Sequence, residues 1–171
     1  MVSGDLQNKE MVGYTWLPTA SMRTLKYFLS DAAKHKARVH QLDFIGSFLQ
    51  AKVNNRVFVK LDIRYTDYFI SYAQYFVRAL RLLKFMYGMT NSGKLFADEL
   101  TEWLIEGGFI QSQFHMSIYY KYAPDRYKIV VLSYVDDCVY WYTNKDIGKW
   151  FVDTLGKIFY VNFLGCSHWF M

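Results

Sequence analysis

The chain has 171 residues, which is enough for one domain and too few for two ordinary ones. Hydrophobic residues make up 53% of it and charged residues 20%, a balance that excludes a disordered tail and a collagen-like chain and allows a sizeable core. The chain has only two cysteines, which excludes a disulfide scaffold. It has no apolar run near the roughly 20 residues of a membrane span, which excludes an integral membrane protein. The first residues predict no secretory signal.

Charge and aromatic content bear on the partners. The formal net charge of +5 mildly favours an anionic partner. Aromatic residues make up 20% of the chain, and aromatic rings can stack on nucleic-acid bases. Filling the core is the other role open to them, and most are expected there.

The first half of the chain predicts helices around short strands. Apolar residues at helical spacing after Ser21 predict a helix over residues 21–36. Residues 39–46 predict a strand that leads into a turn or short helix, and residues 57–60 a short strand. Aromatic residues at helical spacing predict a further helix face over residues 65–76.

The second half predicts hairpins between two helices. The expected elements are a helix that starts at Asn91 or Ser92 and ends at the glycine pair 107–108, a hairpin of residues 117–122 and 127–134, a strand at 138–142, and a helix from 143 to 158. This mixture indicates an α+β fold, an antiparallel sheet with helices packed mainly on one face.

Three acidic residues interrupt apolar segments. Asp136 and Asp137 stand together in the middle of residues 129–142, and Asp43 stands in residues 39–48. A carboxylate among apolar residues costs free energy unless it stays in water or meets a cation. For the pair, a solvated turn and a metal-binding hairpin tip both satisfy this condition. For Asp43, a helix cap or an ion pair is the simpler alternative, and spacing alone cannot bring it near the pair.

Four segments resemble a known family. Tyr134-Val-Asp-Asp137 resembles the polymerase signature of reverse transcriptases, in the form found in copia-type (Ty/copia, Pseudoviridae) LTR retrotransposons. Three more segments resemble blocks of that family in the right order: 39–49 its first catalytic block, 83–89 its Leu-Tyr-Gly-Leu block, and 155–170 the approach to its Phe-Leu-Gly segment. The resemblance covers about residues 15–171 and implies the fingers and palm of a right-hand polymerase.

The resemblance implies a metal-dependent active site. Asp43 and Asp136 would be the principal ligands of two Mg²⁺ ions, with Mn²⁺ as an alternative, and Asp137 and the backbone carbonyl of Phe44 would lie beside them. Mg²⁺ prefers oxygen ligands and uses few carboxylates plus substrate phosphates. The implied activity is DNA synthesis on an RNA or DNA template-primer from deoxynucleoside triphosphates. The two principal carboxylates are expected within about 6 Å, sharing a metal pair, and at least one acid should have a raised pKa.

The resemblance also implies nucleotide contacts. Phe48 matches the aromatic residue that would exclude a 2′-hydroxyl, although a core phenylalanine is the alternative. Lys26 falls where the family carries a basic residue that could meet the triphosphate, and a solvated helix lysine explains it equally well. Asn91 stands where the family has a nucleotide-holding glutamine, one methylene longer.

Contacts to the template-primer are expected from Lys84, Lys94 and Tyr134. Lys94 replaces a family arginine and keeps its charge without the bidentate fork. For the lysines, a solvated surface charge is the alternative.

The resemblance further predicts a piece of a Pol polyprotein: a single partial domain over residues 1–171, without thumb, ribonuclease H, protease or integrase, and within an intracellular virus-like particle if the element is intact. Two rival functions stay open. One is a catalytically dead nucleic-acid-binding remnant of the same fold, and the other is a structural or interaction domain in which Asp43 lies far from the Asp136 pair.

Overall fold

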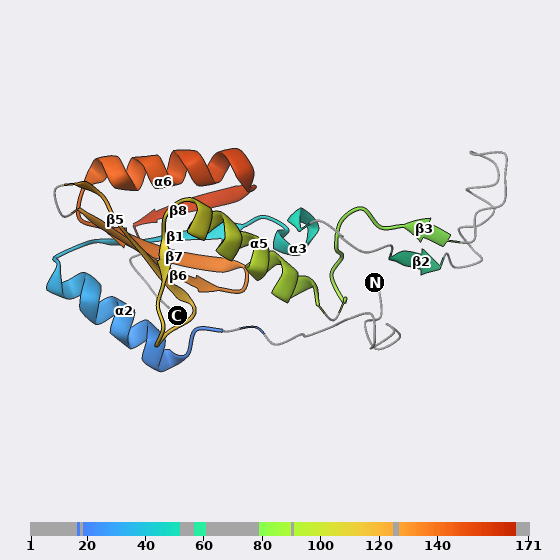
Figure 1. The fold of residues 1–171 in the computed structure, drawn as a ribbon, viewed down its shortest axis with the longest axis horizontal. Coiled ribbons are helices and arrows are strands. Elements are labelled where there is room, and N and C mark those ends of the chain that lie inside the picture. Colours follow the sequence, from blue (N-terminus) through green and yellow to red (C-terminus); the bar gives the residue numbers. More distant parts are fainter. Residues whose placement is uncertain are drawn as a thin grey trace.

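The computed structural model describes residues 17, 19–51, 57–60, 79–89, 91–124 and 127–166 (Figure 1). Three long helices and a six-stranded sheet form the body of the molecule, and a two-stranded ribbon lies to the right of it. The elements in chain order are α2 (Met22–Lys34), β1 (Val39–Phe44), α3 (Ser47–Gln50), β2 (Phe58–Lys60), β3 (Ala79–Arg81), α5 (Ser92–Glu106), β4 (Ile110–Gln111), β5 (Ile118–Tyr122), β6 (Lys128–Tyr134), β7 (Asp137–Tyr142), α6 (Lys145–Ile158) and β8 (Val161–Cys166).

Most of the predicted elements are present near their predicted bounds. Helix α2 begins after Ser21, whose hydroxyl accepts a hydrogen bond from the Thr24 amide and so caps it. Asn144 caps α6 in the same way, through the amide of Asp146. The hairpin of β5 and β6 and the strand β7 follow as expected. The helix predicted over residues 65–76 lies outside the described residues.

The large sheet is antiparallel and has the strand order β4-β5-β6-β7-β1-β8. Strand β1 is therefore inserted between β7 and β8, far from its sequence neighbours. This crossover brings the segment around Asp43 next to the segment around Asp137, which the sequence alone could not show. The short strands β2 and β3 pair with each other in a separate ribbon.

One face of the sheet packs against α5 and α6. Every second side chain of a strand points to the same face, and Leu42, Phe44, Val131 and Tyr140 share one buried cluster on this side. The buried residues of the two helices complete the cluster: Phe96, Leu100, Leu104, Ile147, Phe151 and Leu155. This is the larger of the two cores.

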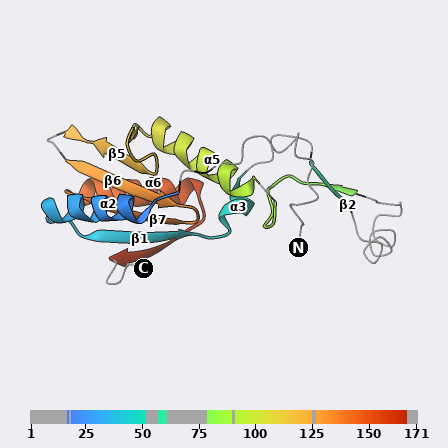
Figure 2. The same cartoon turned by 90° about the horizontal axis from the view of Figure 1, so that it is seen from below.

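Helix α2 covers part of the opposite face. Phe28 and Ala32 of α2 form a second cluster with Val130, Val139 and Trp141. In Figure 2, seen from below, α2 lies in front of the sheet and α6 behind it. Helices were expected mainly on one face, and this holds for two of the three long helices.

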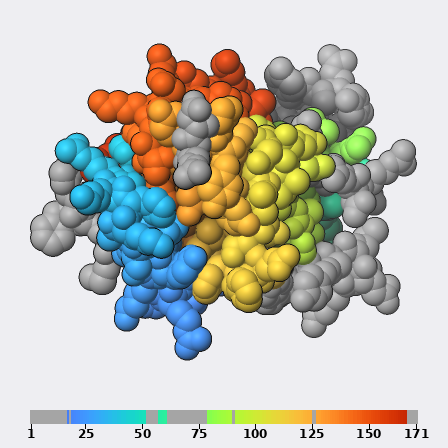
Figure 3. Space-filling model, turned by 60° about the vertical axis from the view of Figure 1, so that its left-hand side comes forward, coloured from blue at the N-terminus to red at the C-terminus, as the bar shows by residue number. Residues whose placement is uncertain are grey.

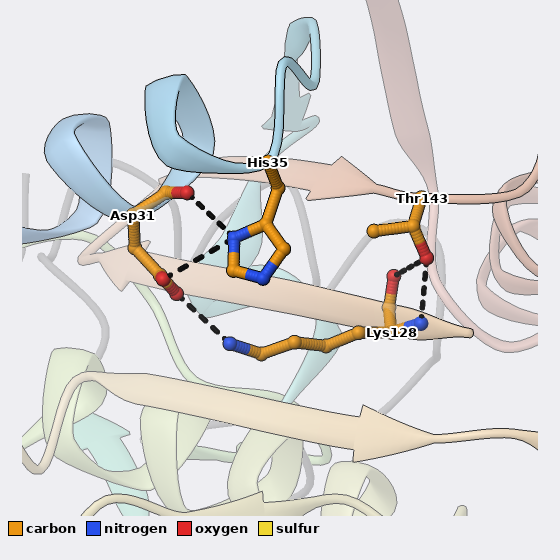
Figure 4. A network of polar contacts seen from close by, with 4 residues as sticks. All are labelled: Asp31, His35, Lys128 and Thr143. Atoms are coloured by element: carbon orange, nitrogen blue, oxygen red, sulfur yellow. Dashed lines mark hydrogen bonds and ion pairs between the residues drawn. The ribbon is translucent and has the colours of Figure 1, made fainter. Parts of the chain in front are cut away.

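Polar contacts fix the C-terminal half of α2 to the sheet (Figure 4). The Lys128 ammonium lies 2.9 Å from Asp31, and His35 lies 3.4 Å from the same carboxylate. The amide of Lys128 also donates a hydrogen bond of 2.8 Å to the Thr143 hydroxyl. Lys128 is the first residue of β6, and His35 follows the last residue of α2. The network therefore holds the end of α2 at the start of β6, at the opposite end of that strand from Tyr134.

None of the helices in the described residues is both long enough and apolar enough for a membrane span.

Candidate active site

The paired acids lie at the tip of the β6–β7 hairpin. Tyr134 and Asp137 face each other as the last register pair, so Val135 and Asp136 form a two-residue turn. Val135 has a φ of 53°, a left-handed conformation that is costly for a β-branched residue. The turn predicted around the acids is therefore present, and its backbone is strained at the residue before Asp136.

A row of polar side chains crosses four strands beside this tip. Asp43 on β1 lies opposite Asp137 on β7, and Asp137 lies opposite Tyr134 on β6. On its other side Asp43 lies opposite Asn162 of β8. Leu42, Phe44 and Cys138, the sequence neighbours of Asp43 and Asp137, belong to the core beneath α5 and α6. The alternation of side chains therefore places the whole row on the opposite face.

Asp136 is tied to the segment that follows Asp43. Its backbone carbonyl accepts a hydrogen bond of 2.9 Å from the Phe44 amide. Its carboxylate oxygen Oδ1 accepts a second one, of 2.6 Å, from the Ser47 hydroxyl. The two catalytic blocks predicted from the sequence therefore meet in space. If the chain were a purely structural or interaction domain, Asp43 was expected to lie far from the Asp136 pair. The structure shows the opposite.

The three acids influence one another electrostatically. Partial burial raises the pKa of Asp137 above its usual value, and the charges of Asp43 and Asp136 raise that pKa further. The expected raised pKa is thus confirmed, with burial as the larger cause. In the described part of the chain, the ion pairs join Asp31 to His35 and Lys128 and Lys94 to Asp98, so none involves these three acids.

The donor set is suited to a divalent cation that substrate phosphates help to hold. Across the described ranges, no group of three or more His, Cys, Asp or Glu side chains is placed so that it could hold a metal ion, and this includes Asp43, Asp136 and Asp137 taken together. Mg²⁺ in nucleotide chemistry is bound by one or two carboxylates together with phosphate oxygens and water. Asp43, Asp136 and Asp137 have no ion-pair partner among the described residues, which is compatible with binding of this kind. The separation of about 6 Å expected between the carboxylates of Asp43 and Asp136 stays a prediction.

Phe48, on α3, packs against the larger hydrophobic core. Its ring packs edge-on against Tyr87, with ring centroids 4.9 Å apart. A methyl group placed at Gly93 would lie 3.4 Å from the same ring, so the start of α5 packs closely on Phe48. Phe48 is half-buried, an exposure that fits both a nucleotide contact and a core residue.

The other predicted contact residues are more dispersed. Lys26 is exposed on the side of α2 away from its buried residues Thr24, Phe28 and Ala32, and Tyr134 is 51% exposed. Lys84 donates a hydrogen bond to the backbone carbonyl of Gln50, and Lys94 forms an ion pair of 2.5 Å with Asp98. Asn91 occupies the N-cap position of α5 and is half-buried. Tyr134 alone among these five lies in the row of the acids.

Gln50 is a structural residue of the site that sequence reasoning missed. Its amide nitrogen donates to the carbonyls of Ile45 and Tyr160, at 2.9 and 3.0 Å. Its amide oxygen accepts from the Tyr160 amide at 2.8 Å. The side chain thus joins the segment after Asp43 to the start of β8. Sequence reasoning also missed Asn162, which lies opposite Asp43. The positions of Gln50 and Asn162 both become visible only when the segment of β1 is placed beside β8.

Two cavities lie between the described elements. A cavity of about 590 Å³ lies between α2 and the strands β4 to β6, and Figure 3 shows α2 in blue beside the yellow segment around β4. A smaller cavity of about 270 Å³ is bordered by Lys94, Tyr119 and Val135. Neither includes any of the three acids, although the smaller one touches the hairpin turn.

Comparison with known sequences shows the family of the chain. The sequence model of the family described as "Reverse transcriptase (RNA-dependent DNA polymerase)" matches residues 6–171. The chain therefore belongs to the reverse transcriptase family and is a reverse transcriptase domain. The family implies a nucleic-acid template and nucleotide substrates, and reverse transcriptases generally use divalent metal ions. No curated protein sequence matches the chain.

Proposed function

We propose that this domain is the fingers and palm part of a copia-type retrotransposon reverse transcriptase, with Asp43, Asp136 and Asp137 as its catalytic acids. The observation that carries the proposal is the cross-strand pair of Asp43 and Asp137, with Asp136 hydrogen-bonded beside it. The charges of Asp43 and Asp136 repel that of Asp137, and none of the three acids has a cationic partner among the described residues. Such an arrangement is costly for a fold that does not use it. A divalent cation would remove that repulsion.

The reaction is the attack of the primer 3′-oxygen on the α-phosphorus of a deoxynucleoside triphosphate, with pyrophosphate as the leaving group. Two divalent ions, Mg²⁺ or Mn²⁺, when bound supply activation of the 3′-hydroxyl and neutralisation of the leaving group. The carboxylates of Asp43 and Asp136 and the Phe44 carbonyl would provide their protein oxygen ligands. Asp137 would be an additional acid beside them. Its pKa is raised first by partial burial and then by the charges of Asp43 and Asp136, and a bound cation would offset the charge repulsion.

The other predicted residues receive supporting roles in this proposal. Phe48, held against Tyr87, would lie under the sugar of the nucleotide, and Asn91 would contact the nucleotide from the start of α5. Lys26 would meet the triphosphate. Tyr134, in the row of the acids, would contact the nucleic acid. Lys84 and Lys94 would contact phosphates, and Lys94 must exchange its partner Asp98 to do so.

In an intact element, the rest of a Pol polyprotein would accompany the domain, and the enzyme would act inside a virus-like particle. The copia-type order of the sequence blocks supports this assignment.

Primer extension tests the proposed function. The chain replaces the corresponding segment of an active copia-type reverse transcriptase, and extension of a DNA primer on an RNA template is measured with Mg²⁺. We expect Mg²⁺-dependent extension that Asp43→Asn or Asp136→Asn abolishes. Asp153→Asn is the matched control, because Asp153 is an exposed acid on α6, beyond the other face of the sheet.

Failure of the chimera would be informative as well. Inactivity together with salt-sensitive binding of primer–template by the 171-residue chain would favour the catalytically dead remnant, since phosphate contacts persist without turnover. Extension that survives Asp43→Asn would contradict the assignment of the acids.

A further inference from the structure

Ser47 makes the closest polar contact to the catalytic acids. Its hydroxyl lies 2.6 Å from Oδ1 of Asp136. Ser47 follows β1 in the chain, and Asp136 precedes β7, the strand that pairs with β1. Ser47 is 0% exposed and opens the short helix α3. The chain turns into α3 through Gly46, whose φ of 58° is a left-handed conformation that glycine adopts without strain. This turn aims the Ser47 side chain at the hairpin tip.

Burial makes this hydroxyl contact specific. A hydroxyl removed from water costs free energy unless it finds a partner. In the described part of the chain, the Asp136 carboxylate is the side-chain group that accepts a hydrogen bond from the Ser47 hydroxyl. A hydrogen bond from a neutral donor to a carboxylate is short and stronger than one between neutral groups. The 2.6 Å distance lies in the range of such hydrogen bonds.

The backbone of Asp136 is held by the same segment. The Phe44 amide donates to the Asp136 carbonyl at 2.9 Å. This bond fixes the main chain of the turn, and the Ser47 bond fixes the side chain. Asp136 needs both, because it follows Val135, whose strained φ of 53° must be stabilised by its surroundings.

We propose that Ser47 is a positioning residue for Asp136: its hydroxyl donates to Oδ1 and so fixes the orientation of a carboxylate that, with Asp43, would hold a divalent cation. This inference rests on the proposed function for the role of the cation, but the orientation itself is a property of the metal-free protein. Residues that orient a ligand carboxylate typically change metal affinity 10- to 100-fold when removed. Ser47 would therefore act on affinity without touching the cation.

The test compares two buried serines. Ser47→Ala removes the hydroxyl that reaches Asp136. Ser92→Ala is the matched control, because Ser92 is 3% exposed and donates to the Met89 carbonyl at 3.0 Å, with no contact to the acids. Binding of Mn²⁺ to the 171-residue chain is measured by electron paramagnetic resonance. We expect Ser47→Ala to weaken Mn²⁺ binding by about tenfold or more, and Ser92→Ala to leave it within about twofold of the unsubstituted chain.

A metal-free measurement separates this inference from the proposed function. Three-bond couplings to the β-protons of Asp136 report whether its side chain holds one rotamer. We expect the Asp136 side chain to hold one rotamer in the unsubstituted chain and in Ser92→Ala. In Ser47→Ala we expect it to average over several rotamers. An averaged Asp136 side chain in the unsubstituted chain would overturn the inference even if Ser47→Ala did not fold.

The two measurements together leave no ambiguous outcome. If the unsubstituted chain binds no Mn²⁺ while Asp136 still loses its single rotamer in Ser47→Ala, the proposed function fails and the positioning role stands. If Mn²⁺ binds equally to the unsubstituted chain and to Ser47→Ala, the positioning role fails and the proposed function is unaffected.

Discussion

Asp43 on β1 lies directly opposite Asp137 on β7, and their side chains point to the same face of the sheet. Directly paired residues on adjacent strands have Cβ atoms about 4.5–5.5 Å apart, and like charges at such positions are destabilising. The fold therefore keeps an unfavourable pair at the end of β7, where the strands of two separate sequence blocks meet.

Stability should depend on the charge of Asp137. Its pKa is raised on folding, so the folded chain binds more protons than the unfolded one between the usual and the raised pKa, and stability falls as pH rises through that window. Asp137→Asn removes this loss. We expect the variant to be more stable at pH 7 by less than about 1 kcal/mol, since the group is exposed. Urea unfolding at several pH values measures the difference in the free energy of unfolding between Asp137→Asn and the unsubstituted chain. This gap should close below the usual carboxyl pKa. A gap that persists there contradicts the prediction.

The strained turn should tolerate glycine. Val135 has a φ of 53°, and relieving such strain is worth about 1–3 kcal/mol, less the cost of the greater freedom of glycine in the unfolded chain. We expect Val135→Gly to raise the free energy of unfolding by about 1 kcal/mol. Val135→Ile keeps the β-branch and the strain, so it should differ little from the unsubstituted chain. A loss of stability in the glycine variant would show that packing of Val135 outweighs the strain.

Two glycines of α6 should respond oppositely to alanine. A methyl group at Gly148 would lie 2.4 Å from the Tyr142 ring, whereas one at Gly156 would lie no closer than 3.6 Å to Phe163. Gly148→Ala should lower stability by about 1–3 kcal/mol through overpacking. Gly156→Ala should raise it by up to about 1 kcal/mol because alanine favours helix. Denaturant midpoints for the two variants measure both effects, and equal shifts would mean that Tyr142 moves aside freely.

Gln50 should stabilise the junction between the Asp43 segment and β8. Gln50→Ala removes three hydrogen bonds to the backbone of Ile45 and Tyr160, at an expected cost of about 1–2 kcal/mol. Hydrogen exchange should accelerate at the Ile45 and Tyr160 amides. Gln113→Ala is the control, because Gln113 is exposed in the turn after β4. Unchanged protection at both amides would show that backbone pairing alone holds this junction.

Phe48 should influence the choice of sugar. In the active chimera, Phe48→Val removes the ring that would clash with a 2′-hydroxyl, so ribonucleotide incorporation should rise about tenfold or more relative to deoxynucleotide incorporation. Leu49→Val is the control, because Leu49 is its exposed neighbour. Comparison of kcat/KM for the two nucleotide types measures the effect. Unchanged discrimination would leave Phe48 as a residue that packs on Tyr87.

The sequence by itself determined the local elements and the identity of the acids. Helical spacing, Ser21 and a capping box over residues 143–146 predicted α2 and α6, because these signals depend on residues within one or two turns. In the structure the N-cap of α6 is Asn144. The isolated acids Asp43, Asp136 and Asp137 stood out because a carboxylate is unexpected in an apolar strand.

Tertiary structure alone decided what these acids contact. The insertion of β1 between β7 and β8 places Asp43 opposite Asp137 and Asn162, and it brings Ser47 to Asp136 and Gln50 to Tyr160. Each of these pairs joins residues far apart in the chain, and no local periodicity encodes them. Strand order arises from burying both faces of the sheet at once, under α5 and α6 on one side and α2 on the other. That is a property of the packed chain as a whole, and it is why the composition of the site could be predicted and its geometry could not.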